Sequence, residues 1–380
     1  MVPGMASPRY TFFATCAPGI EPTLHAEVAA LKLGKVERQV GGVRFEGTMR
    51  DAWRANLWLR TAVRVLRREA RFMAASESAL DEGVAGIDWR AFLTPGGTLW
   101  VDAQTKDSGL DHSQFLAQRV KDGIVDQVRG EDGTRPSVDR DTADVRVHLH
   151  LYKDRATLSV DTSGHSLHRR GWRTAQGRAP LAETLAAAVV LMSDWNRRSP
   201  LIDPFCGTGT LLVEGGMIAA NLAPGLTRER FGFESWRDHD EIAWQRARAE
   251  AQAAMIMPSK LRLVGHDIMQ NRLDEASAHL DAMGLGKLSS LELGDAREFA
   301  PREGWNATVV ANMPYGERIG NEVEPLHEAF GACLRTLPGY TTSIITGSSR
   351  LAGLLRLSRP TRHRVLNGGI ECEVVVATIP

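Results

Sequence analysis

The chain has 380 residues, of which 43% are hydrophobic and 24% charged, with 36 glycines and 17 prolines. This composition is typical of a globular protein and excludes disordered and fibrous classes, while the length predicts two or three domains. The 46 basic and 46 acidic residues balance, which excludes a polycationic coat. Residues 1–180 nevertheless hold 26 Lys and Arg against 22 Asp and Glu, so this half is better suited to face a polyanion.

The cysteines and the N-terminus indicate the compartment. The cysteines lie far apart, without a C-x-x-C pair, so we predict neither a metal site nor the disulfide framework of a secreted protein. They are Cys16, Cys206, Cys333 and Cys372. The N-terminus lacks a basic segment followed by an apolar one, and no run approaches the roughly 18–20 apolar residues that a membrane span needs. We therefore expect a cytoplasmic protein without membrane contact.

Residues 8–70 alternate strand and helix patterns. Strands are expected at 10–14 and 42–45, and helices at 21–33 and 51–65. This order predicts a small α+β module with its helices on one face of a sheet.

Residues 71–163 predict a second α+β module. A strand at 98–105 precedes a long helix, for which Asp111 is the expected N-cap. The apolar stripe of this helix repeats every four residues, at Leu116, Val120, Ile124 and Val128. Two alternating strands, at 144–151 and 156–163, close the unit.

Residues 164–180 form a candidate linker with four arginines, two histidines and no acid. Two interpretations of this segment remain open. It is either a solvated connector or a segment that contacts phosphates, with an aromatic ring available to stack on a base. Under the second interpretation the RNA-binding residues are Arg169, Arg170, Trp172 and Arg173.

From residue 181 the pattern becomes that of a doubly wound α/β domain. A helix at 181–196, a buried strand at 201–203, a glycine loop and a helix to about residue 220 begin it. A helical insertion is expected at 221–258. Strands then recur at 261–265, 288–293, 308–311 and 343–346, and a hairpin with its turn at 367–369 and its return strand at 371–378 ends the chain.

The glycine loop Asp203-Pro-Phe-Cys-Gly-Thr-Gly-Thr210 follows the first strand of this domain. Gly207 and Gly209 allow a tight turn and a close approach of a ligand. The loop lacks the third glycine of the dinucleotide fingerprint and the Gly-Lys-Ser/Thr of a P-loop, which points to S-adenosylmethionine rather than NAD or ATP. The candidate cofactor-binding residues here are Asp203, Pro204, Phe205, Cys206, Gly207, Gly209 and Thr210.

Two further acids follow the next two strands. Asp267 is placed to accept hydrogen bonds from ribose hydroxyls, and Asp295, followed by Ala296, to accept one from an adenine amine. For either acid alone, a helix cap or a surface role is an equal alternative. Their position on successive strand ends favours a shared cofactor site.

The fourth strand ends in Asn312-Met-Pro-Tyr-Gly316. An exocyclic amine on a base is a poor nucleophile, because its lone pair is delocalised into the ring. The amide oxygen of Asn312 and the carbonyl of Met313 or Pro314 are suited to accept its two N–H bonds, while Tyr315 stacks on the base. The alternative is an Asn-initiated loop beside a proline.

These motifs resemble a known family, the THUMP-domain RNA guanine-N2 methyltransferases. The resemblance rests on the glycine loop, the Asn-x-Pro-Tyr end and the segments at 167–173 and 179–185. Further segments at 86–92, 120–126 and 135–141 are most similar to the bacterial branch that modifies 23S ribosomal RNA. The similarity covers nearly the whole chain.

The resemblance implies an α/β fold with three parts. A ferredoxin-like module at 8–70 and a THUMP RNA-binding module at 71–163 would precede the basic linker at 164–180. A class I Rossmann-like, S-adenosylmethionine-dependent methyltransferase domain would follow at 181–380. We expect the protein to be a monomer.

The implied activity is the formation of N2-methylguanosine in structured RNA, with 23S rRNA favoured. Carried over to this sequence, Asp203, Gly207 and Gly209 line the cofactor, and Asp267 and Asp295 meet its ribose and adenine. Residues 312–315 hold the target base. A tRNA guanine-N2 methyltransferase and a non-catalytic RNA-binding or ribosome-assembly factor stay open as alternatives. The RNA-binding modules argue against a DNA substrate and hence against an N6-adenine DNA methyltransferase.

Two positions depart from the family pattern. Met313 stands where the family usually has proline, so the backbone carbonyl is kept and the stiffness is lost. Met269 stands where a second acid usually follows Asp267. Many large-subunit members also carry a second methyltransferase domain after this one, whereas this chain ends at Pro380.

Overall fold

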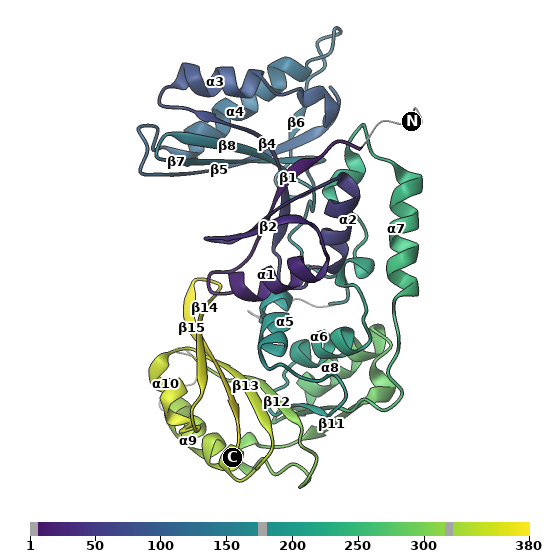
Figure 1. Cartoon of the computed structure of the whole chain (residues 1–380), viewed down its shortest axis with the longest axis vertical. Coiled ribbons are helices and arrows are strands. Elements are labelled where there is room, and N and C mark those ends of the chain that lie inside the picture. The colour runs from purple at the N-terminus through teal and green to yellow at the C-terminus, as the bar shows by residue number, and fades with distance from the viewer. Residues whose placement is uncertain (1–6, 174–180, 316–321) are drawn as a thin grey trace.

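The computed structural model describes residues 7–173, 181–315 and 322–380 of the chain. The end of the expected linker, at 174–180, and Gly316 lie outside these described residues. Figure 1 shows the N-terminal half at the top and the C-terminal α/β half at the bottom. Within the described ranges, no helix is long and apolar enough to cross a bilayer.

A single sheet runs through the N-terminal half. Its strands are β1 (Tyr10–Thr15), β2 (Gly34–Gln39), β3 (Gly42–Gly47), β4 (Arg64–Met73), β5 (Thr98–Lys106), β6 (Ser137–Val138), β7 (Val145–Tyr152) and β8 (Arg155–Asp161). Among the described residues these eight stand in the order β2-β3-β1-β4-β8-β7-β5-β6. β4 pairs with β1 on one side and with β8 on the other. The module boundary expected between residues 70 and 71 therefore falls inside a strand that both modules share.

Helices cover one face of this sheet. They are α1 (Glu21–Ala30), α2 (Met49–Trp58), α3 (Glu77–Ala85) and α4 (Ser113–Val128). The predicted apolar stripe of α4 is buried, as its spacing of four residues requires. The predicted N-cap is wrong by one residue. His112, not Asp111, caps α4, since its Nδ1 accepts a hydrogen bond from the Phe115 amide at 3.0 Å.

The helix expected at 51–65 is also wrong in its second half. α2 ends at Trp58 because Leu59 takes an extended conformation, with ψ of 113°. The chain then enters β4, which pairs with β1 on one side and with β8 on the other. This pairing outweighs the local helical pattern of the sequence. β2 was not predicted, because its sequence Gly-Lys-Val-Glu-Arg-Gln holds one apolar residue and it lies at the edge of the sheet.

The C-terminal half contains a second sheet. Its strands are β9 (Leu201–Asp203), β10 (Leu263–Asp267), β11 (Ser289–Leu293), β12 (Thr308–Asn312), β13 (Thr341–Thr346), β14 (Thr361–Asn367) and β15 (Ile370–Thr378). The order over the described residues is β11-β10-β9-β12-β13-β15-β14. β9 to β13 are parallel, and β15 is antiparallel to both β13 and β14. This is the predicted doubly wound α/β arrangement.

Helices cover both faces of the second sheet. They are α5 (Glu183–Met192), α6 (Thr210–Ala219) and α8 (Gln270–Ala282) on one face, and α9 (Val323–Arg335) and α10 (Ser349–Leu354) on the other. Leu201 and Val310 point into the core beneath the first group, whereas Ile202 and Val309 point into the core beneath the second. A parallel sheet covered on both faces explains the continuous apolar runs of its strands.

The expected helical insertion at 221–258 packs against the N-terminal half. It contains the short 3-10 turns η2 (Pro224–Thr227) and η3 (Gly232–Ser235) and the helix α7 (Glu241–Ala253). Trp53 of α2 lies 5.9 Å from the ring of Phe233 and 6.0 Å from that of Trp244. Arg60 also donates to the carbonyl of Leu222 at 2.8 Å. The two halves thus share a packed interface.

Candidate active site

A cleft of about 150 Å³ opens at the carboxyl ends of β9 and β12. The strand order reverses between these two strands, and this switch point is where open α/β sheets bind ligands. The cleft is lined by Leu181, Asp203, Phe205, Cys206, Gly207, Thr208, Thr210, Leu211, Arg272 and Asn312. It brings the predicted glycine loop together with the first residue of the predicted target-base segment.

The loop turns tightly into α6. Gly207 and Gly209 have φ of +51° and +79°, values that favour glycine. A side chain at Gly209 would meet Ala276 of α8 at 3.0 Å, whereas one at Gly207 would meet nothing within 4 Å. The Cys206 amide donates to the carbonyl of His266 at 2.9 Å and ties the loop to β10. Gly209 therefore serves close packing, and Gly207 borders open space.

Asp203 ends β9 and is only 1% exposed. Its Oδ1 accepts a hydrogen bond from the Phe205 amide at 3.0 Å. Burial, together with the nearby charge of Asp267, raises the pKa of Asp203 to about 8. The carboxyl is therefore mostly protonated at neutral pH. Burial likewise raises the pKa of the Cys206 thiol, so this cysteine is no thiolate nucleophile.

Asp267 ends β10 beside the loop. Its Oδ2 accepts from the Gly207 amide at 3.0 Å, and its Oδ1 from the Met269 amide at 2.9 Å. The carboxylate thus fixes the turn of the glycine loop. Each carboxylate oxygen still has a lone pair available for a further donor.

Asp295 follows β11 and caps the 3-10 turn Ala296–Glu298, accepting from the Arg297 amide at 2.8 Å. Its carboxylate also pairs with the Arg297 guanidinium at 2.5 Å. The next residue, Ala296, is buried. The structure thus shows the capping role that the sequence left open for Asp295, and its contact with an adenine stays a prediction.

The end of β12 offers hydrogen-bond acceptors to the cleft. Among the described residues, Oδ1 of Asn312 is buried without a hydrogen-bond partner. The Met313 amide donates to the Ile345 carbonyl at 3.1 Å, and the Met313 side chain is 0% exposed in the core beneath α9. Met313 therefore has only its backbone to offer a ligand. A buried amide oxygen without a partner is costly, which marks Asn312 as a site for a donor from outside.

Tyr315 is held by the C-terminal hairpin. The Asn367 side chain donates from Nδ2 to the Tyr315 hydroxyl at 2.7 Å. A side chain at Gly347 would come within 2.6 Å of the Tyr315 Cβ, so only glycine fits beneath this residue. Burial raises the pKa of the Tyr315 hydroxyl, which keeps it neutral. Asn367 lies 52 residues from Tyr315 in the sequence, and no sequence pattern indicated the contact.

Two of the four predicted RNA-binding residues of the linker, Arg170 and Trp172, are instead buried, so their predicted role as RNA contacts is wrong. Arg170 is 2% exposed and pairs with Glu214 of α6 at 3.2 Å. Trp172 packs edge-on against His279 of α8, with ring centroids 5.1 Å apart, and is not available to stack on a base. Arg169 is exposed, and its RNA contact stays a prediction.

Arg173 supports the glycine loop directly. It pairs with Glu183 of α5 at 2.9 Å and donates to Oγ1 of Thr210 at 3.1 Å. His279, beneath Trp172, lies 3.0 Å from the carbonyl of Thr208 through its Nδ1. Residues 170–173 thus brace the cofactor loop, because Arg170 and Arg173 pair with acids on the helices α6 and α5 that follow in the chain.

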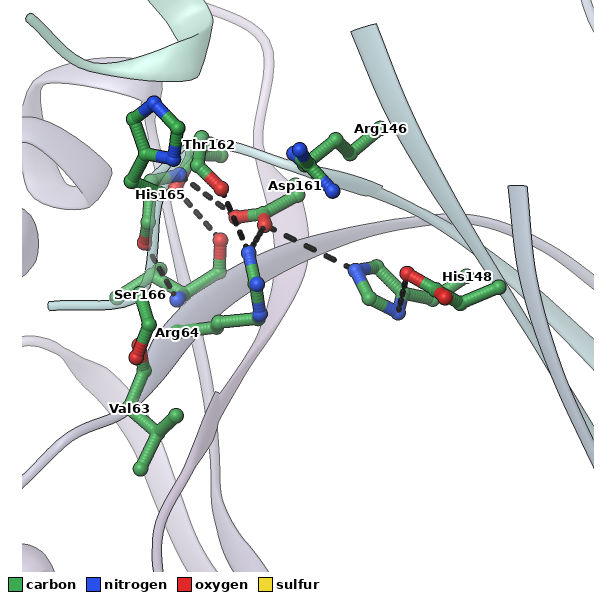
Figure 2. A network of polar contacts seen from close by, with 12 residues as sticks. Val63, Arg64, Arg146, His148, Asp161, Thr162, His165 and Ser166 are labelled. Carbon is green, nitrogen blue, oxygen red and sulfur yellow. Dashed lines mark hydrogen bonds and ion pairs between the residues drawn. The ribbon is translucent and has the colours of Figure 1, made fainter. Parts of the chain in front are cut away.

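The start of the linker is fixed to the first sheet. Figure 2 shows Arg64 of β4 and His148 of β7 pointing at Asp161, the last residue of β8. Burial opposes the ionised form of Asp161. The hydrogen bond from His148 and the charge of Arg64 outweigh this effect, so the pKa of Asp161 is lowered. Arg64 also donates to the Gly164 carbonyl at 2.6 Å. This network anchors the linker where β4, β7 and β8 meet.

Sequence reasoning missed part of the cleft wall. Arg272 on the first turn of α8 lines the cleft and lies 3.3 Å from Glu275. Nothing in its local sequence distinguishes it from a surface arginine. The other lining residues that were not predicted are Leu181, Thr208 and Leu211.

Three family models match successive parts of the chain. The RlmL ferredoxin-like domain matches residues 11–66, and the THUMP domain matches residues 74–161. The RMKL-like methyltransferase domain matches residues 170–375, more than half of the chain. The chain belongs to the RMKL-like methyltransferase family. The predicted family and fold are confirmed.

A curated relative covers almost the whole chain. Ribosomal RNA large subunit methyltransferase K/L of Methylococcus capsulatus is 40% identical over 97% of this chain and 51% of its own length. The chain spans about half the length of the curated relatives it matches.

Two solved structures share the complete fold. SMU.472, solved as a complex with SAH, has a TM-score of 0.88 at 28% identity, and the match covers 99% of both chains. A protein of Listeria monocytogenes described as a predicted N6-adenine-specific DNA methylase has a TM-score of 0.86 at 29% identity. The match covers 98% of this chain and 97% of the Listeria monocytogenes chain.

Proposed function

We propose that this protein transfers a methyl group from S-adenosylmethionine to the N2 amine of a guanine in structured RNA, with 23S rRNA as the favoured substrate. The observation that carries the proposal is the cleft at the switch point, where Asp203 and the buried Oδ1 of Asn312 face the same space. The names of the curated relatives support the RNA substrate.

The cofactor fits the residues present. Gly207 leaves the loop backbone open to a ligand. The carboxyl of Asp203 would ionise beside a cationic amino acid end, and Asp267 supplies acceptors for a ribose. The complex of SMU.472 with SAH supports this choice. Sites for ligands of this size usually measure about 300–1,000 Å³, so the cleft accounts for one end of the cofactor. We place the remainder over the ends of β10 and β11, towards Asp267 and Asp295.

When bound, S-adenosylmethionine supplies an electrophilic methyl group. Asn312 Oδ1 and the Met313 or Pro314 carbonyl accept the two N–H bonds of the target amine and help localise its lone pair. Tyr315 lies along the base and holds it in line with the methyl group. Reaching this pocket requires the guanine to leave its stack.

We further propose that the protein acts on RNA rather than DNA, as a monomer in the cytoplasm. Residues 8–70 and 71–163 would serve as RNA-binding modules, with the linker at 164–180 and the methyltransferase domain at 181–380. The matches to the ferredoxin-like and THUMP families support these roles. The description of the Listeria monocytogenes relative keeps N6-adenine as a second candidate target for the same acceptor groups.

The deciding experiment is transfer of labelled methyl from S-adenosylmethionine to separated 23S rRNA, 16S rRNA and tRNA from a strain that lacks the protein. Nucleoside analysis of each fraction then identifies the product. Label in N2-methylguanosine of 23S rRNA supports the proposal. Label in tRNA would show that the substrate is tRNA rather than 23S rRNA. Label in N6-methyladenosine would show that the target atom is N6 of adenine rather than N2 of guanine.

The variant Asn312→Ala tests the catalytic role of Asn312. We expect methyl transfer to fall by two orders of magnitude or more, because one acceptor of the amine is removed. Cofactor affinity, measured by calorimetry, should stay within about twofold of wild type, a difference of roughly 0.4 kcal/mol. Near-normal turnover would remove Asn312 from the mechanism. No transfer by the wild type to rRNA, tRNA or ribosome precursors would favour a non-catalytic RNA-binding factor.

A further inference from the structure

The face of the first sheet opposite the helices carries a continuous polar surface. Along β7, Val147, Leu149 and Leu151 point into the core, so the residues between them point to the other face. His150 is paired with Thr157 of β8, and Thr157 with Arg71 of β4. These partners form a row across three strands. The shared strand β4 thus joins the polar surfaces of both N-terminal modules.

This face is hollowed into a groove of about 760 Å³. The groove receives side chains from β1 to β4 of the first module and from β7 and β8 of the second. Figure 1 shows the strands that contribute these side chains, with β7 and β8 near the top and β2 below them.

Positive charge dominates the groove. Arg68, Arg71, Lys153 and Arg155 line it, and no ion pair within the described residues involves them. Two acids line it as well, and each is already neutralised: Glu37 pairs with Lys35 and Arg44, and Glu69 pairs with Arg67. Burial and the charges of Arg44 and Arg71 lower the pKa of Arg68, as expected where cations gather.

An aromatic platform accompanies these cations. Tyr152 is 41% exposed, and its ring stacks on that of His150 at 6.5 Å with an interplanar angle of 26°. The Lys153 amine lies 5.4 Å from the centre of the Tyr152 ring. Exposed rings flanked by cations are what proteins use to hold single-stranded nucleic acid, because bases stack on the rings and phosphates meet the charges.

We infer that this groove binds an unpaired stretch of RNA, with Arg68, Arg71 and Arg155 on its phosphates and Tyr152 stacked on a base. The inference rests on the proposed function for the identity of the nucleic acid. It places the RNA contacts on the joint of the two N-terminal modules, outside the linker.

The test compares full-length variants by fluorescence anisotropy with a labelled 20-nucleotide oligouridylate and by filter binding with 23S rRNA. In the triple variant Arg68→Gln, Arg71→Gln, Arg155→Gln we expect at least tenfold weaker binding at moderate salt. The slope of log K against log salt should fall by about 2, since each phosphate contact to a single strand contributes roughly 0.7. Tyr152→Ala should weaken binding about tenfold and leave the slope unchanged.

The matched control removes three exposed cations elsewhere, in Arg129→Gln, Arg198→Gln, Arg246→Gln. It should bind both RNAs as the wild type does. Because Arg68 is half-buried, the double variant Arg71→Gln, Arg155→Gln serves as a second test, with an expected fall in slope of about 1.4. Circular dichroism and thermal unfolding confirm that each variant is folded.

Three outcomes would overturn the inference. They are an unchanged affinity and salt slope in both groove variants, an equal loss in the control variant, and a wild-type protein that binds neither RNA. Methyl transfer by the wild type is measured separately. If the wild type binds RNA through the groove but transfers no methyl group, the proposed function is wrong and the inference that the groove binds RNA is supported. If transfer is normal and the groove variants bind normally, only the groove inference fails.

Discussion

Asp203 shows how one residue's surroundings set its chemistry. Its carboxyl is buried at the end of β9, has one amide donor and lies near a second acid, so it holds its proton up to a pKa of about 8. Because this folded pKa lies above the unfolded value of about 3.9, the protonated carboxyl contributes stability at low pH. That contribution is lost as the pH rises towards 8.

Cofactor affinity should follow the same titration. A cationic ligand beside Asp203 favours the ionised carboxylate, so the affinity for S-adenosylmethionine should rise with pH up to about 8. The change is at most about tenfold per pH unit. Calorimetry at pH 6, 7, 8 and 9, in two buffers of different ionisation enthalpy, measures the affinity and the released proton. Asp203→Asn should remove the pH dependence of the affinity. If the affinity of the wild type does not change with pH, Asp203 does not face the cofactor's charge.

The residues of the cleft were predictable where polar groups directly follow strands. Asp203, Gly207 and Asn312 follow buried runs, and parallel strands bring such ends together. Asn367 and Arg272 were not predictable. Their roles come from contacts with distant elements, and neither residue belongs to a local pattern.

At the scale of elements, the arginines after Ser163 show how later helices change the role of a basic segment. A run of arginines without acids reads as a surface for polyanions, yet Arg170 and Arg173 meet Glu214 and Glu183 on helices that come later in the chain. Strands and helices with strong periodicity, such as α4, were predictable. The turn from α2 into β4 was not, because long-range strand pairing decides it.

Trp172→Ala tests the bracing role of this segment. The ring is buried against His279, so its loss should lower the free energy of unfolding by about 3–5 kcal/mol and weaken cofactor binding. The salt slope of RNA binding should not change. Urea unfolding and the same anisotropy assay measure both quantities, with Trp172→Phe as the milder control. A stable variant with weaker RNA binding would restore the stacking role that the sequence suggested.

At the scale of the whole molecule, buried charges join the two halves. Arg170 donates to the Arg60 carbonyl at 2.5 Å and pairs with Glu214, while Arg60 donates to the Leu222 carbonyl. Burial raises the pKa of Glu214, against the opposing charges of Arg170 and Arg60. Removing one partner would leave a buried charge without compensation.

Arg170→Ala should therefore destabilise the protein by about 3–5 kcal/mol. We also expect the wild type to unfold in a single transition and the variant in two, because the cluster links both sheets. Differential scanning calorimetry records both effects. The neighbouring Arg169→Ala removes an exposed cation and should change the unfolding temperature little. Equal melting curves for Arg170→Ala and the wild type would mean that the aromatic interface alone joins the halves.

The strand β4 also has a consequence for how this protein can be divided. It is hydrogen-bonded on both sides, once to each N-terminal module. Cutting the chain at residue 70 would leave each fragment with a severed strand and a new sheet edge, whose open N–H and C=O groups invite pairing with another molecule. Fragments cut there are therefore prone to aggregation or strand exchange. Any truncation intended to isolate RNA binding should keep residues 8–163 together.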